Sequence, residues 1–154
     1  METQFEEIVA ALQDKAVLKQ HIFRSTIAVF QMLRVMTDDI GKRLGEKFAA
    51  IDKTVVIETM QINEFEFQIK FGGDVLMFSM QTNVQTFGPE HILTKSAYVL
   101  EDAHRGYYGT LTVYNFMADS VKYNRLNDAG YLLARMMINC EGHFYIEGLR
   151  QMNF

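Results

Sequence analysis

A strict two-residue alternation between residues 64 and 71, followed directly by two glycines, constrains the fold of this chain more than any other feature. One face of the segment carries Phe65, Phe67, Ile69 and Phe71, and the other carries Glu64, Glu66, Gln68 and Lys70. This period is typical of a half-buried strand, because successive side chains point to opposite sides of a sheet. Gly72 and Gly73 suit a two-residue turn, and residues 74–80 fit the returning strand. The sequence therefore predicts a β-hairpin with one apolar face.

A proline-free block precedes this hairpin. Apolar residues recur at helical spacing from 3 to 15, with acidic residues near the start, and again from about 16 to 50. As one helix, the second block would be about 50 Å long, which exceeds the width of a domain of this size. Thr37, Asp38 and Asp39 are weaker helix formers within it. We therefore expect either a break near Asp38 or packing of the far end against another subunit.

The rest of the chain divides into short elements. Strands are expected at 54–57, 96–101, 109–117 and 143–147, an exposed connection at 83–95 and a helix at 128–139. The whole chain, 1–154, is predicted to be a single domain, with a helical segment at 1–50 and a sheet with one helix at 51–154. We predict an α+β fold: N-terminal helices on one face of a mostly antiparallel sheet of about five strands, with a short C-terminal helix before the last strand. A parallel α/β sheet is the weaker alternative, because only one helix interrupts the strands.

Composition and charge limit the expected location and partners. Cys140 is the only cysteine, and the acidic start lacks the features of a secretory signal, so we expect a cytoplasmic protein. Apolar runs are shorter than the roughly 18 residues of a membrane span, so no membrane is expected. Residues 54–117 carry seven acidic and three basic side chains, within a net charge of −4. Because nucleic acid binders normally present a basic face, nucleic acid is not an expected partner.

Polar and aromatic residues crowd the last third of the chain. Those that we single out as candidate ligand-binding residues are Tyr123, Asn124, Arg125, Asn127, Asp128, Tyr131, Arg135, His143, Tyr145 and Glu147. A helix beginning at residue 128 would offer free backbone amides to an anion, and Arg125 would add a guanidinium. We therefore predict a small polar or anionic ligand near residues 123–135. The alternatives are that Asn127 and Asp128 only cap the helix, or that these side chains fasten it to the sheet.

Recognised catalytic chemistry is absent from the sequence. A last strand would place Glu141, His143 and Glu147 on one face, but alternate residues lie about 6.6 Å apart, so a metal site is not predicted. No serine has a nucleophile-elbow context, and Cys140 beside His143 is only a sequence neighbour. The mixture of Arg105 with strand aromatics resembles RNA-binding sheets in composition alone. No cofactor, metal or catalytic residue is therefore assigned.

These observations favour a non-catalytic cytoplasmic module that self-associates as a homodimer, through the long N-terminal helical block or a sheet edge. The alternative is a small-molecule enzyme with a polar site formed by Arg125, Asp128, Arg135, His143 and Glu147. A third possibility, a partner-binding adaptor, predicts an exposed apolar patch without a deep pocket.

Overall fold

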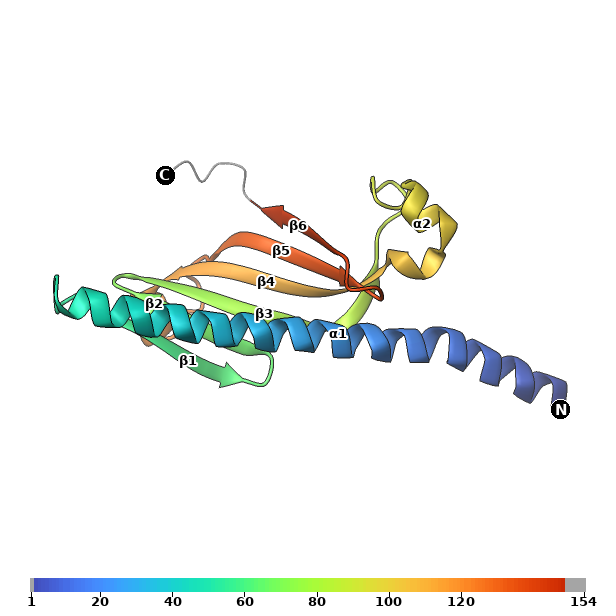
Figure 1. The fold of residues 1–154 in the computed structure, drawn as a ribbon, viewed down its shortest axis with the longest axis horizontal. Helices are drawn as coiled ribbons and strands as arrows, with labels where there is room; N and C mark the ends of the chain where they lie inside the picture. The colour runs from blue at the N-terminus through green and yellow to red at the C-terminus, as the bar shows by residue number, and fades with distance from the viewer. Residues whose placement is uncertain (1, 149–154) are drawn as a thin grey trace.

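The computed structural model describes residues 2–148, which form one long helix and a six-stranded sheet (Figure 1). Helix α1 is Glu2–Ala49, and strands β1, β2 and β3 are Ile57–Asn63, Glu66–Phe71 and Asp74–Thr86. A short helix α2, Ala97–Glu101, and a 3₁₀ turn η1, Ala103–Gly106, precede strand β4, Tyr107–Met117. Helix α3, Ala118–Lys122, then leads to strands β5, Tyr131–Asn139, and β6, Phe144–Gly148.

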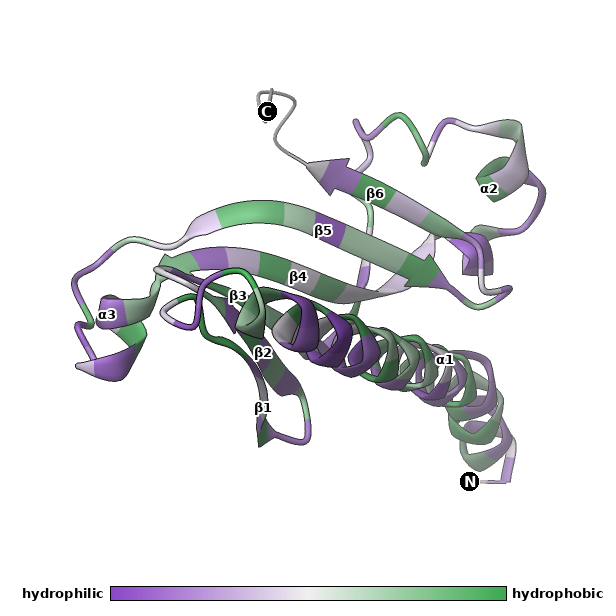
Figure 2. Cartoon of the chain, turned by 60° about the vertical axis from the view of Figure 1, so that its left-hand side comes forward, coloured by the Kyte–Doolittle hydropathy of each residue, from purple (hydrophilic) through white to green (hydrophobic). Residues whose placement is uncertain are grey.

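The sheet is a meander in which each strand pairs antiparallel with the next one along the chain, in the order β1-β2-β3-β4-β5-β6. Helix α1 runs across one face of it, and its N-terminal part extends past the sheet (Figure 1). Figure 2 shows α2 and α3 beyond opposite ends of the strands. None of the helices within residues 2–148 combines the length and apolar character needed to cross a membrane.

The core lies between α1 and the middle strands. Its buried members are Phe30 on α1 with Phe67, Met80, Leu111 and Ile138 on four neighbouring strands. Phe67 connects the two layers, since its ring centroid lies 5.1 Å from that of Phe30 and 4.5 Å from that of Phe78. The predicted apolar face of the hairpin therefore packs against the helix, as expected from its alternation.

Two glycines permit α1 to approach the sheet closely. A Cβ built on Gly109 of β4 would lie 2.0 Å from Thr26 Oγ1, and one on Gly41 of α1 would lie 2.7 Å from Thr59 Cγ2. Thr26 is completely buried, and its hydroxyl is satisfied by the carbonyl of Ile22, at 2.7 Å. Contact of the helix with the strand backbone thus fixes where α1 crosses β4.

The predicted α+β class, the hairpin and the packing of the N-terminal helix on one sheet face are confirmed. The sheet has six strands rather than about five, and the first begins at Ile57 rather than at residue 54. The expected break near Asp38 is wrong, because α1 is continuous over 48 residues. Buried Gly41 and half-buried neighbours pack this part of α1 on the sheet, and such packing outweighs weak local propensity.

Two segments have the opposite structure from that predicted. Most of the strand expected at 96–101 is instead helix α2, Ala97–Glu101, because the Ser96 hydroxyl accepts a hydrogen bond from the Val99 amide and caps the first turn. The helix expected at 128–139 is wrong, since Tyr131–Asn139 is strand β5. The short helix of this region is α3, at 118–122, two strands before the end. The expected connection at 83–95 begins later than predicted, because β3 continues to Thr86.

Candidate functional site

The predicted site residues lie in three separate places along the sheet. Five of them occupy the connection between α3 and β5, and a sixth begins β5: Tyr123, Asn124, Arg125, Asn127, Asp128 and Tyr131. Arg135 and Glu147 pair across β5 and β6. His143 precedes β6, near the end of β5 opposite to that at which Tyr131 lies. The two ends of a nine-residue strand are about 27 Å apart, so these residues do not form one site.

The first group forms a turn whose polar groups bond to one another. Ser120 donates a hydrogen bond to Asp128 Oδ2 at 2.5 Å, and Arg125 Nη1 lies 3.9 Å from the same oxygen. Asn124 adopts a left-handed backbone with φ of 49°. Arg125 and Asp128 line an open hollow of about 310 Å³ beside α3. The capping alternative requires a helix at 128–139, so these side chains instead stabilise the α3–β5 turn.

The second group is a charge cluster on the face opposite α1. Arg135 Nη1 lies 3.7 Å from Glu147 Oε2, as expected for directly opposed residues of antiparallel strands. His91 belongs to the loop after β3, and its Nε2 atom is 3.5 Å from Glu147 Oε1. The His91 ring stacks on Phe87 at 4.4 Å and meets Tyr145 edge-on at 5.8 Å. This cluster attaches residues 87–91 to the β5–β6 pair.

The third group surrounds the hydroxyl of Tyr98, on α2. This hydroxyl donates to Glu141 Oε2 at 2.5 Å, accepts from Asn139 Nδ2 at 2.8 Å and lies 2.8 Å from His143 Nδ1. A phenol oxygen has one proton and two lone pairs. His143 must therefore donate through Nδ1, which assigns the proton of the neutral ring to that nitrogen.

The protonation of this network follows from its contacts. Hydrogen bonds from Tyr98 and Arg105 lower the pKa of Glu141 below its usual value, whereas burial, followed by the bond to Glu141, raises the pKa of Tyr98. Glu141 is therefore ionised at neutral pH and Tyr98 keeps its proton, in agreement with the direction of the bond between them. Arg105 donates from Nε to Glu141 at 2.9 Å and from Nη1 to Glu101, and these bonds raise its pKa further.

Asn139 closes the network. Its Oδ1 accepts from the backbone amides of Glu141 and His143, both at 3.0 Å, which shapes the β5–β6 turn. Its Nδ2 also reaches the carbonyl of Arg105, at 3.4 Å. The Arg105 guanidinium lies 4.5 Å from the centre of the Tyr98 ring. The network thus holds α2 and η1 on the β5–β6 turn.

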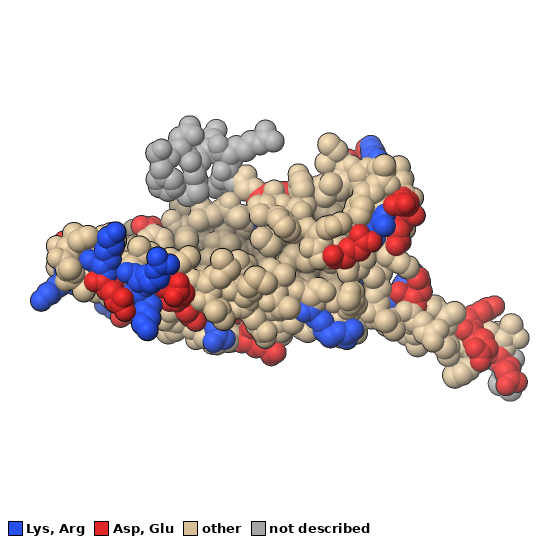
Figure 3. Space-filling view, in the orientation of Figure 1, with Lys and Arg blue, Asp and Glu red and all other residues tan. Residues whose placement is uncertain are grey.

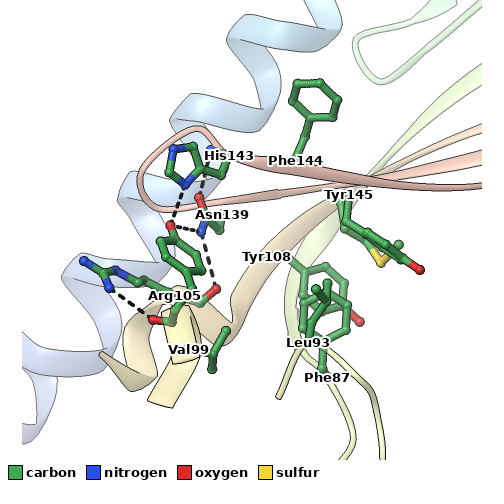
Figure 4. Close-up of a pocket in the computed structure, with 11 residues that line it drawn as sticks. Phe87, Leu93, Val99, Arg105, Tyr108, Asn139, His143, Phe144 and Tyr145 are labelled. Atoms are coloured by element: carbon green, nitrogen blue, oxygen red, sulfur yellow. Dashed lines mark hydrogen bonds between the residues drawn. The ribbon is translucent and has the colours of Figure 1, made fainter. Parts of the chain in front are cut away.

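A cavity of about 190 Å³ lies beside this network (Figure 4). One wall contains Arg105, Asn139 and His143, and the facing wall contains Phe87, Leu93, Tyr108 and Tyr145. Met137, which is 4% exposed, and the buried Val99 also line the cavity. Burial also raises the pKa of Tyr108. Of the predicted site residues, only His143 and Tyr145 line this cavity.

Sequence reasoning missed most of these residues because their partners are distant along the chain. Tyr98 lies 41 positions from Asn139 and 43 from Glu141, and local periodicity carries no signal of such pairs. Ser96 was the available signal, because a serine three residues before the capped amide is typical of a helix start. A helix at 97–101 would have drawn attention to the side chains that it presents.

The contacts of Cys140 and His143 show whether these two residues act as a catalytic pair. Cys140 Sγ lies 3.7 Å from the carbonyl of His104, and burial raises its pKa, so it is a thiol at neutral pH. His143 bonds Tyr98 and not Cys140. Within residues 2–148, no three His, Cys, Asp or Glu side chains group closely enough to hold a metal ion. In comparisons with protein families, curated proteins and solved structures, the chain matches none.

Proposed function

We propose that the chain is a non-catalytic cytoplasmic module that self-associates as a homodimer through α1. The part of α1 that extends past the sheet carries this proposal (Figure 1). Phe5, Ile8 and Leu12 there are 63%, 59% and 57% exposed. They share a side of the helix with the buried Ile22 and Thr26. An apolar stripe that is buried at one end and bare at the other favours a second partner.

A second apolar surface lies beside α1, toward β6. Leu33 of α1 lines a groove of about 120 Å³ with Met136 and Ile146, and its walls are almost entirely apolar. Met36 and Ile40 continue the stripe of Leu33 at spacings of three and four, and both are about half exposed. Figure 3 shows uncharged side chains over the area between α1 and β6. This area is a fitting contact for the exposed stripe of another copy.

The charges of α1 favour a second copy in the opposite direction. Residues 2–14 contain four acidic side chains and neither Lys nor Arg, whereas 42–53 contain four basic and two acidic ones. In a two-fold pair with antiparallel helices, the acidic end of each copy lies against the basic end of the other. A parallel pair would instead bring like charges together.

Antiparallel pairing also matches the apolar residues. With the two-fold axis near Arg24, Leu12 of one copy faces Met36 of the other, and Ile8 faces Ile40. Each copy then covers part of the exposed stripe and flank of its partner, so that the interface is closed and stops at two chains.

The remaining parts of the proposal have narrower support. The five residues of the alternative enzyme site are divided among three clusters, which argues for a binding role over catalysis. A single half-buried thiol is compatible with a reducing compartment, which favours the cytoplasm.

The test is the mass of the protein in solution, measured by light scattering at micromolar concentration. We expect twice the mass of one chain for the wild type and the mass of one chain for Leu12→Glu, which places a charge in the interface. Gln13→Glu, an equally charged change at the next position, is the control and keeps the double mass. Circular dichroism verifies that both variants fold. A wild type with the mass of one chain overturns the proposal.

A further inference from the structure

We propose that the cavity between the α2–η1 segment and the end of strands β4–β6 binds a small uncharged molecule with one aromatic ring. The cavity is separate from the groove between α1 and β6, so this proposal is independent of self-association. The proposal rests on three properties of the cavity: its size, the fixed positions of its aromatic side chains, and the fact that its polar side chains are already paired with one another.

The size of the cavity suits a single ring. Its volume of about 190 Å³ is somewhat larger than the ~150 Å³ apolar cavity of another protein that binds benzene. Drug-sized ligands need more space, about 300 Å³ or above. Met137 and Val99 provide buried apolar surface. A one-ring compound with a short substituent therefore fits, whereas a nucleotide or cofactor does not.

The aromatic wall is held in place before any ligand arrives. The Phe87 ring lies 4.3 Å from Tyr108 and 4.4 Å from His91, and the His91 ring meets Tyr145 edge-on. His91 is held in place from both ring nitrogens, because Nδ1 accepts a hydrogen bond from the Leu93 amide and Nε2 lies 3.5 Å from Glu147 Oε1 on β6. Such rings offer both faces and edges at the distances that a further ring prefers. Little ordering is then required on binding, which preserves affinity.

The polar wall has its charges and hydrogen bonds already matched. Arg105 donates to Glu101 and Glu141, and the Tyr98 hydroxyl makes all three of its possible bonds. An anionic ligand would compete with Glu141 for Arg105, and a cationic ligand would compete with Arg105 for Glu141. Either competition leaves a charge unpaired, which is costly in a partly desolvated site. This wall therefore selects an uncharged ligand.

The experiment uses four probes: benzyl alcohol, benzoate, benzylamine and cyclohexylmethanol. The methyl resonance of Met137 reports occupation of the cavity by nuclear magnetic resonance, and that of Met32, exposed on α1, is the internal control. We expect benzyl alcohol to shift the Met137 methyl in a saturable way and to leave Met32 unchanged. The charged probes and the saturated probe are expected to bind at least about tenfold more weakly.

Paired variants localise the binding. Leu93 is half-buried at the rim of the cavity, so the larger side chain of Leu93→Trp fills part of it. We expect this variant to bind benzyl alcohol at least about tenfold more weakly than the wild type. Ile92→Trp adds the same side chain at the neighbouring exposed position, outside the cavity, and leaves binding unchanged. An unmoved Met137 methyl, equal binding by Leu93→Trp, or equally tight binding of any of the other three probes overturns the proposal. The probe series needs only the wild type, so it remains decisive if Leu93→Trp does not fold.

Discussion

At the scale of single residues, Gly109 leaves less room for a Cβ than any other glycine within residues 2–148. A Cβ on residue 109 would lie 2.0 Å from the Thr26 hydroxyl, so Gly109→Ala must push α1 away from β4. We expect a loss of about 1–3 kcal/mol in the free energy of unfolding, the usual cost of overpacking. Urea denaturation measures this loss of stability.

Gly88→Ala is the control, because a Cβ added there meets nothing within 4 Å. Restoration of part of the loss by adding Thr26→Ala identifies the clash as its cause, whereas an unchanged midpoint in Gly109→Ala contradicts the prediction.

Glu141 makes the fold sensitive to acid. Its pKa is lower in the folded protein than the usual 4.5, because Tyr98 and Arg105 donate hydrogen bonds to it. The folded state therefore binds fewer protons than the unfolded state between these two pKa values, and stability rises with pH there. The contribution is present above about pH 4.5 and is lost as the pH falls through the folded pKa.

Replacement by Gln removes this sensitivity. We expect Glu141→Gln to be less stable than the wild type at neutral pH, with a difference that shrinks as the pH falls below 4.5. Urea midpoints measured across the acid range test this. Glu46→Gln, at an exposed position on α1, is the control. A difference between the wild type and Glu141→Gln that does not change with pH would exclude the carboxylate charge as its source.

At the scale of elements, the sequence predicted those whose local pattern and tertiary setting agree. The hairpin has alternation, a glycine turn and one buried face, and all three indicate the same structure. Strand β5 lacks this agreement: Leu, Ala and Met are good helix formers, and its apolar residues do not alternate. Met136 and Ile138 face the side of α1 while Met137 lines the cavity, so both faces of β5 are covered. Only the pairing of this segment with β4 and β6 in the folded protein identifies it as a strand.

The candidate site had the same limit. His143 and Tyr145 were identified because polar aromatic residues near a strand stand out in sequence. Their partners Phe87, Tyr98 and Tyr108 come from segments at least 35 residues away, which only the fold brings together. The error at 128–139 also displaced the predicted anion site, because without a helix the free backbone amides that it needed do not exist.

Helix α2 presents Tyr98 to the network, so its cap bears on the site. The Ser96 hydroxyl accepts from the Val99 amide at 3.3 Å and donates to the carbonyl of Leu93 at 2.6 Å. We expect Ser96→Ala to weaken the local structure by about 1 kcal/mol, which is about a fivefold faster hydrogen exchange of the Val99 amide. Ser96→Thr, which keeps the hydroxyl, is the matched control. Unchanged exchange in Ser96→Ala would show that the cap is not needed.

At the scale of the whole molecule, antiparallel pairing of α1 makes a prediction about salt. The acidic segment 2–14 of each copy lies against the basic segment 42–53 of the other, so a dimer contains this attraction twice. Because salt screens the attraction between exposed charges, we expect the dissociation constant of the wild-type dimer to rise by about tenfold between about 0.05 M and 0.5 M salt. Sedimentation measures the dissociation constants.

Glu6→Lys makes the N-terminal end of α1 less acidic. It is expected to weaken the dimer at low salt, with an effect that shrinks as salt is added. Gln31→Lys, at an exposed position near the middle of α1, is the control for a general change in net charge. A dissociation constant that does not depend on salt would exclude the antiparallel arrangement while leaving self-association itself to the mass measurement.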